Sequence, residues 1–204
     1  NEFKIIFWWE WIHRFLGRLV GISFLIPLII FTVKLNFNKL KSLYFIFLLI
    51  CFQGFLGWYM VSSGLVDRID VSHYRLSIHL LMAFIILSLI YWNYLKLKKI
   101  NMNNEINTFL VLIFVFLIFL QIIIGAFVSG MDAGQIYNSW PLMGNNYFPD
   151  DNAIVDLFKL TAFDSPSLVQ FIHRNLAYVI LLFFLIILFD VYKNKLASFY
   201  LPVN

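Results

Sequence analysis

Residues 109–130 read FLVLIFVFLIFLQIIIGAFVSG, an apolar run without a single charged residue. A helix rises about 1.5 Å per residue, so this run can cross the roughly 30 Å hydrocarbon core of a bilayer. Other long stretches have the same character, and none shows the polar–apolar alternation of membrane β-strands. We therefore predict an all-α integral membrane protein, a helical bundle with five transmembrane helices. Their predicted ranges are 9–33, 42–63, 75–95, 107–130 and 171–192.

The composition supports a membrane environment and excludes several classes of protein. Hydrophobic residues make up 62% of the chain and charged residues 13%, whereas soluble domains average about half and about a quarter. The net charge of +4 comes from lysines clustered between apolar runs, which is typical of topology signals rather than of nucleic-acid binding. Cys51 is the only cysteine. An intrachain disulfide, a Cys-x-x-Cys-His haem attachment and a four-thiolate iron–sulfur site are thereby excluded.

The connections between the spans predict an orientation. Lysines cluster in the connections after the first, third and fifth spans. Acidic residues gather in the other connections, above all in the long loop that follows the fourth span. Because basic residues favour the cytoplasmic or matrix side, we expect the first, third and fifth spans to begin at the outer face. The lysines that define the inner side are Lys34, Lys39, Lys41, Lys96, Lys98, Lys99, Lys193 and Lys195.

The loop at about 131–170 is the only long connection, and long loops in compact proteins are usually functional. It contains Trp140 and two tyrosines, Tyr137 and Tyr147, which suit a membrane interface. Two interpretations stay open: a lid over a site below it, or a loop that rests at the interface without a chemical role. The chain begins without Met and ends soon after a span, so we expect it to be an internal piece of a longer protein.

Two short patterns occur twice. Gln53-x-x-x-Gly57 resembles Gln121-x-x-x-Gly125, and Glu10-Trp-Ile-His13-Arg14 resembles Gln170-Phe-Ile-His173-Arg174. Repeated halves are common in membrane proteins, which favours duplication of a smaller helical bundle.

Three of the four histidines, His13, His79 and His173, fall near the outer ends of the first, third and fifth spans. Polar groups inside a membrane usually mark function, and imidazole is a common axial ligand of haem iron. Zinc or non-haem iron would require clustered Cys or carboxylate ligands, and Glu10 is the only carboxylate nearby. Hydrogen bonding between helices is the alternative role for each of these histidines. We expect His73, just outside the third span, to be a surface residue.

Charged residues accompany these histidines. Arg14, Arg18, Arg75 and Arg174 each lie within five residues of one of them. Their guanidinium groups suit haem propionates, although they could instead reach toward lipid headgroups. Glu10 precedes His13 by three residues and shares its helix face. A partly shielded carboxyl group there could transfer protons, or it could simply stabilise the start of the helix.

At these residues the sequence resembles haem A synthase, in the cysteine-free branch found in mitochondria and alphaproteobacteria. The resemblance spans nearly the whole chain. The matching stretches are Glu2–Lys4 with Phe7–Arg14 and Gly17-Arg18, Gln53-Gly54 with Gly57–Leu65, Val71–Leu76 with His79-Leu80, Asp132–Gly134, Tyr137-Asn138 with Trp140–Met143, and Gln170–Arg174 with Ala177-Tyr178.

The resemblance implies an eight-helix protein built from two four-helix halves, of which this chain would hold helices two to six. Residues 1–100 would belong to the first half, with the substrate haem O between His13 and His79. Residues 101–204 would belong to the second half, where His173 would bind a haem b cofactor and its partner histidine would lie beyond residue 204. The implied reaction is the oxidation of the C8 methyl group of haem O to a formyl group, with Glu10 as the catalytic residue. The product would be haem A for cytochrome oxidase.

Other functions remain open at this stage. A bis-histidine membrane cytochrome that carries electrons between quinol and a partner would use the same histidines but would not need Glu10. A transporter or an assembly scaffold would give them no haem-dependent role. Expected partners are membrane lipid and haem O synthase as donor, with a homo-oligomer left open. The expected location is a bacterial plasma membrane or a mitochondrial inner membrane, with the haem sites toward the outer face.

Overall fold

The computed structural model describes residues 5–62, 71–98 and 107–193, apart from the side chain of Ile6. Several residues used in the sequence argument lie outside these ranges. They are Glu2–Lys4, Ser63–Leu65, Lys99 and Lys195.

Five long helices dominate the described residues: α1 (Ile5–Lys34), α2 (Phe37–Ser62), α3 (His73–Leu97), α4 (Thr108–Gly130) and α5 (Pro166–Lys193). Each is long and apolar enough to cross a membrane. The described ranges contain no β-strand, only an isolated bridge between Met143 and Asn146. The predicted all-α class with five transmembrane helices is therefore confirmed, while the numbering of these helices as two to six stays a prediction.

The helices extend beyond their apolar centres. The helix α5 begins at Pro166 rather than at the predicted residue 171, and α1 is helical from Ile5 rather than from residue 9. Hydropathy marks only the part of a helix at hydrocarbon depth, so it misses the start of α5, which carries Ser167 and Gln170. Proline is well suited to the first turn of α5 because the amide that it lacks would have no partner within the helix. His13, His79 and His173 consequently lie four, two and five residues further along their helices than the sequence suggested.

The chain forms two compact units. One contains residues 1–63 and 82–100, and the other contains residues 64–81 and 101–204. The continuous helix α3 thus contributes its first nine residues to the second unit and the rest to the first. The proposed division into domains 1–100 and 101–204 stays a prediction.

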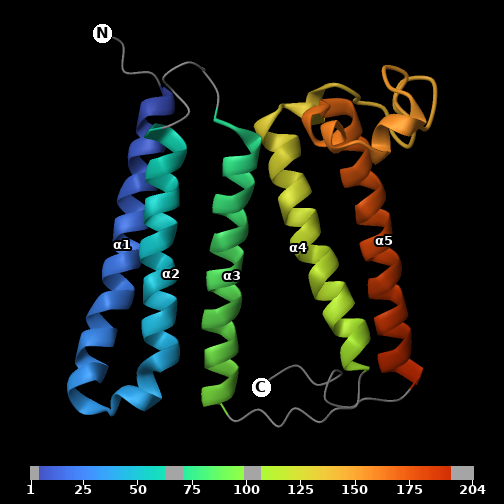
Figure 1. The fold of residues 1–204 in the computed structure, drawn as a ribbon. Helices are drawn as coiled ribbons and strands as arrows, with labels where there is room; N and C mark the ends of the chain where they lie inside the picture. Colours follow the sequence, from blue (N-terminus) through green and yellow to red (C-terminus); the bar gives the residue numbers. More distant parts are fainter. Residues whose placement is uncertain (1–4, 63–70, 99–106, 194–204) are drawn as a thin grey trace. The chain divides into compact units, whose positions relative to one another are not determined.

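In the first unit, α1 and α2 lie side by side as an antiparallel pair (Figure 1). The rings of Phe24 and Phe47 stack between them with centroids 6.3 Å apart. Nearer the connecting turn, the hydroxyl oxygens of Thr32 and Tyr44 lie 2.6 Å apart. A hydroxyl pair of this kind satisfies polar groups that would otherwise face hydrocarbon.

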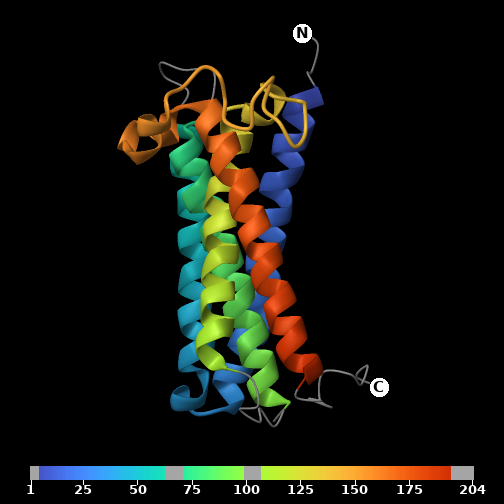
Figure 2. The ribbon, with the colours of Figure 1, turned by 90° about the vertical axis from the view of Figure 1, so that its right-hand side faces the viewer.

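In the second unit, α4 and α5 pack together along their length, and the segment 131–165 folds over one end of the pair (Figure 2). The core of this unit is formed by Ile124, Phe127 and Val169, with Ile172 and Leu176 packed against it. Three short 3₁₀ helices shape the covering segment: η1 (Ala133–Gln135), η2 (Ile154–Phe158) and η3 (Leu160–Asp164). The long loop is therefore a folded cap on the α4–α5 pair.

Candidate functional site

The predicted catalytic residue Glu10 lies on α1 and forms an ion pair with Arg14. Their Oε2 and Nη2 atoms are 3.1 Å apart, and more than half of each side chain is exposed. His13 lies between them in sequence, eight residues after the start of α1, which is about 12 Å along the helix axis. Arg18 follows Arg14 by one further turn, and it is exposed like the other members of this group. The structure thus places all four predicted residues on adjoining turns of one helix.

The second predicted pair lies on α3. Arg75 and His79 are four residues apart, so they share a helix face, and both are partly buried. His79 is the seventh residue of α3, about 9 Å from its start. Because His13 belongs to the first compact unit and His79 to the second, their pairing around one haem stays a prediction.

His173 lies on α5, where its ring faces α4. The amide nitrogen of Gln121 lies 3.3 Å from Nε2 of His173 and 3.2 Å from its backbone carbonyl oxygen, to which it donates. Gly125, one turn further along α4, leaves room for the ring: a Cβ atom there would lie 3.2 Å from Cε1 of His173. Gln121 therefore orients the imidazole, and Gly125 accommodates it.

Nδ1 of His173 is buried and has no hydrogen-bond partner among the described residues. A haem-ligating imidazole must present one ring nitrogen that is free of competing hydrogen bonds. The imidazole of His173 meets this requirement and is compatible with haem ligation, although Nε2 of His73 is also buried without a hydrogen bond to any described residue. No group of three or more His, Cys, Asp or Glu side chains that could hold a bare metal ion occurs within the described ranges.

Arg174 points into the covering segment. Its Nη2 donates to the backbone carbonyl of Tyr137 at 2.6 Å, and its Nη1 donates to those of Ser139 at 2.9 Å and Leu142 at 3.4 Å. Gln170, one turn before it, also donates to the Tyr137 carbonyl at 2.9 Å. The sequence prediction that Arg174 binds a haem propionate did not anticipate these contacts.

The expectation that His73 is a surface residue was wrong. Its side chain is only 16% exposed, because the ring packs edge-on against Phe127, with centroids 5.0 Å apart, and against Tyr74. Its Nε2 lies 3.6 Å from Oδ1 of Asp164, an oxygen that also accepts a hydrogen bond from the Tyr74 hydroxyl at 2.9 Å. These contacts join the start of α3 to η3. Tertiary packing across 90 residues, which no local pattern reveals, buries this histidine.

A second polar cluster fastens the covering segment to the start of α5. The carboxylate of Asp151 accepts hydrogen bonds from Ser167 at 2.8 Å and from the hydroxyl of Tyr137 at 3.2 Å. Burial tends to raise the pKa of Asp151, but the bonds from Ser167, Asn152 and Tyr137 outweigh it and leave the pKa lowered. Burial, followed by the nearby charge of Asp151, raises the pKa of Tyr137.

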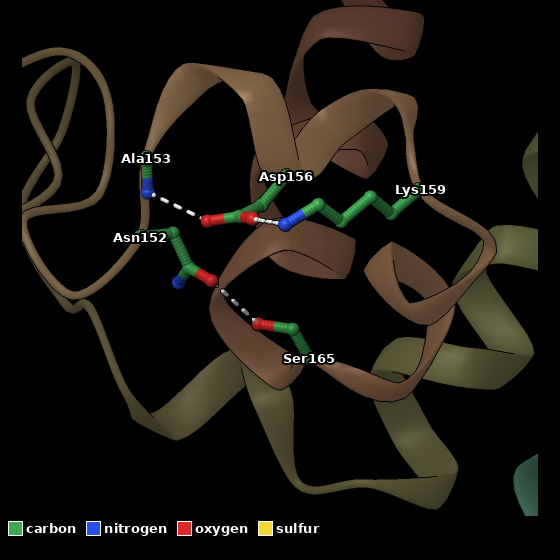
Figure 3. A network of polar contacts seen from close by, with 5 residues as sticks. All are labelled: Asn152, Ala153, Asp156, Lys159 and Ser165. Atoms are coloured by element: carbon green, nitrogen blue, oxygen red, sulfur yellow. Dashed lines mark hydrogen bonds and ion pairs between the residues drawn. The ribbon is translucent and has the colours of Figure 1, made fainter.

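The neighbouring turn of η2 has its own polar contacts (Figure 3). Asp156 accepts a hydrogen bond from the backbone amide of Ala153 at 2.9 Å and one from Nζ of Lys159 at 2.7 Å. In the same view, the hydroxyl of Ser165 donates to the side chain of Asn152. The segment is thus held together by its own side chains as well as by α5.

Comparison with known proteins supports the predicted resemblance. The family described as cytochrome oxidase assembly protein matches residues 1–201. The chain belongs to this family. No solved structure matches it.

Curated relatives in the cytochrome oxidase assembly protein family carry a more specific name. A protein named heme A synthase from Pelagibacter ubique is 50% identical over 202 residues, which cover 98% of this chain and 60% of that protein. Heme A synthases from Parvibaculum lavamentivorans and Rickettsia bellii are 45% and 42% identical, covering 89% and 100% of this chain and 54% and 64% of theirs. The predicted resemblance to haem A synthase is confirmed, and the chain spans about 54–64% of the length of these relatives.

Proposed function

We propose that this chain is part of a haem A synthase, an oxidoreductase that converts the C8 methyl group of haem O into the formyl group of haem A for cytochrome oxidase. The observation that carries the proposal is the 50% identity to a curated heme A synthase over 98% of the chain. The position of each predicted histidine supports it. His13, His79 and His173 all lie in the second or third turn of a membrane-spanning helix.

We propose His173 as one axial ligand of a resident haem b. A partly buried imidazole that Gly125 accommodates and that keeps one ring nitrogen without a hydrogen bond to any described residue supports this role. When bound, such a haem would supply one-electron redox chemistry. Gln121 would keep the imidazole oriented toward the iron, and the partner ligand would lie beyond residue 204.

For the substrate site, we propose His13 and His79 as the residues that bind haem O. Arg14, Arg18 and Arg75 would bind its propionates, since guanidinium groups pair well with carboxylates. Glu10 would hold or transfer a proton beside the methyl group that reacts. Its present ion pair with Arg14 would keep the carboxylate near the substrate edge until a propionate competes for the arginine.

The location and partners follow from the same proposal. The lysine-rich ends of the helices would face the cytoplasm or matrix, which places the haem sites toward the outer face of a bacterial plasma membrane or mitochondrial inner membrane. Haem O synthase would donate the substrate. A homo-oligomer is compatible with the apolar helix faces, many of which are exposed.

The deciding experiment is Glu10→Ala in the full-length protein, with the haems extracted and separated by chromatography. We expect the variant to retain bound haem, to accumulate haem O and to form no haem A. Asp190→Ala, a carboxylate near the opposite end of its own membrane helix, is the control and should form haem A normally. Normal haem A in Glu10→Ala would refute the catalytic assignment. A low-spin haem spectrum without any conversion of haem O by the unmodified protein would favour the electron-carrier alternative.

A further inference from the structure

Arg174 is surrounded by backbone carbonyls from a single segment. The three oxygens that it contacts, from Tyr137, Ser139 and Leu142, lie 2.6–3.4 Å from its terminal nitrogens. A guanidinium group carries five N–H donors in a planar fork and is always charged. It is therefore well suited to hold several carbonyl dipoles at once.

Other side chains of α5 also form hydrogen bonds with residues 137–147. Gln170 donates to the Tyr137 carbonyl at 2.9 Å, Tyr178 accepts from the indole nitrogen of Trp140 at 2.6 Å, and Asn175 accepts from the hydroxyl of Tyr147 at 2.5 Å. Residues four apart lie above one another on a helix, so positions 170, 174 and 178 form one stripe. We call the four residues Gln170, Arg174, Asn175 and Tyr178 the α5 clamp, and residues 137–147 the clamped segment.

The clamp lies next to the proposed haem ligand. His173 immediately precedes Arg174, and its ring turns toward α4, where it meets Gln121 and Gly125. The clamp residues turn toward the clamped segment instead. The same two turns of α5 thus hold the histidine on one face and the covering segment on another.

The hydrogen bonds of Arg174 also bear on the prediction that it binds a haem propionate. Both terminal nitrogens already donate to carbonyls of the clamped segment, and these are the atoms that a fork-like pairing with a carboxylate would use. Moving the guanidinium to a propionate would break all three bonds at once, and the charge-assisted bond to the partly buried carbonyl of Tyr137 is the one whose loss would cost most.

We propose that Arg174 is a positioning residue: it fixes the clamped segment against the outer turns of α5 and affects haem bound at His173 through that segment, not through contact with a propionate. The clamped segment then keeps water from the outer side of these turns, and the haem potential depends on that exclusion. The part concerning haem rests on the proposed function, whereas the clamp itself does not.

The test compares Arg174→Ala, Arg174→Lys and Gly144→Ala in the full-length protein. Gly144 lies in the clamped segment with φ +79°, and a Cβ atom there would be 3.1 Å from Asp150 and 3.3 Å from Tyr137. Its replacement therefore disturbs the segment while leaving Arg174 in place. Lys159→Ala, which removes a cation from the same loop outside the clamped segment, is the matched control.

Two quantities are measured: amide hydrogen exchange in the clamped segment, and the midpoint potential of the bound haem. Loss of charge-assisted hydrogen bonds should speed exchange by about tenfold to a hundredfold in Arg174→Ala. Arg174→Lys should not restore protection, because a single ammonium group cannot reproduce the fork. We expect Gly144→Ala to shift exchange and potential in the same direction as Arg174→Ala, and Lys159→Ala to change neither.

Other results of these measurements would overturn the proposal. A changed potential with unchanged exchange in Arg174→Ala, or full recovery of the potential by lysine, would show direct contact with the haem and overturn the proposal. Unchanged exchange together with an unchanged potential would also overturn it. If Arg174→Ala fails to fold, Gly144→Ala and Tyr178→Phe decide by the same two measurements. If the unmodified protein binds no haem b, the proposed function fails, and the exchange data still decide whether the clamp exists.

Discussion

The backbone of Gly130, the last residue of α4, lies directly against His73, the first residue of α3. A Cβ atom added at Gly130 would be 2.9 Å from Cβ and 3.0 Å from Cα of His73. Distances this short to backbone and Cβ atoms cannot be relieved by rotating a side chain. The close approach brings the His73 ring onto Phe127 and within 3.6 Å of Asp164, so three separate parts of the second unit meet at this glycine.

We predict that Gly130→Ala separates the start of α3 from α4. Overpacking of this kind costs about 1–3 kcal/mol, and it should lower the thermal midpoint of the full-length protein in detergent and speed amide exchange around His73. Gly21→Ala is the control, since a Cβ atom at Gly21 meets nothing within 4 Å. That control should leave the midpoint unchanged or raise it, because alanine favours a helix interior over glycine by about 1 kcal/mol. Equal effects of the two substitutions would contradict the close approach.

Two of the three histidines of the second unit, His73 and His173, should respond differently to substitution. His173→Ala should abolish the haem b absorption of the full-length protein, because His173 is the proposed haem ligand. His73→Ala should retain that absorption and lose only local stability, since its ring is used for packing and for the contact with Asp164. Loss of absorption in His73→Ala with retention in His173→Ala would reverse our assignment of ligands.

Crowding the imidazole provides a milder test of the same site. Gly125→Val places branched carbon atoms where a Cβ atom alone would already approach Cε1 of His173 to 3.2 Å. We expect a shifted haem spectrum with weaker binding, while the helix content measured by circular dichroism stays constant. Gly54→Val, in a helix of the other unit with open space around its Cα, is the control for placing valine in a membrane helix. A spectrum unchanged by Gly125→Val would argue against ligation by His173.

The sequence predicted the five spans well because crossing a membrane imposes a long apolar run that hydropathy detects directly. It also placed His13, His79 and His173 near the same ends of their helices, since helix direction follows from the order of the spans. The repeated Gln-x-x-x-Gly pattern contained a further signal. Gln121 and Gly125 turn out to be the residues that orient and accommodate His173.

The contacts of the covering segment could not be predicted in the same way. Arg174 binds carbonyls 32 to 37 residues away, and the partners Tyr74 and Asp164 are 90 residues apart. Such contacts depend on the path of an irregular loop, which has no periodicity to read. His73 was misjudged for this reason: its position outside the apolar run suggested exposure, whereas the fold of the loop covers it.

The attachment of the covering segment to α5 should weaken in acid. The pKa of Asp151 is lowered in the folded protein because the bonds from Ser167, Asn152 and Tyr137 outweigh the effect of burial. A carboxyl group of this kind stabilises the fold above its unfolded pKa of about 3.9, and the stabilisation is lost as the pH falls through the lower, folded value. We expect protection of the segment from protease to be constant between about pH 5 and 7 and to fall below about pH 4. Asp151→Asn should reduce this dependence but leave a part from Asp156, whose pKa is also lowered, chiefly by the hydrogen bond from Lys159. Asp132→Asn should keep the full dependence; an unchanged acid response in Asp151→Asn would exclude Asp151 as a source.

The orientation in the membrane can be tested by cysteine labelling. The lysine-rich turn between α1 and α2 should face the cytoplasm and the segment 131–165 the outside, which would place the haem sites toward the outer face. In a cysteine-free version of the full-length protein, which includes Cys51→Ser, a single cysteine is introduced as Ala153→Cys or as Asn36→Cys, both exposed positions. A membrane-impermeant maleimide added to intact, outer-membrane-permeabilised cells should label Ala153→Cys at once and Asn36→Cys only after the inner membrane is broken. The reverse pattern would place the proposed haem chemistry on the cytoplasmic side. Haem O and haem A would then be exchanged at the cytoplasmic face instead of the outer face.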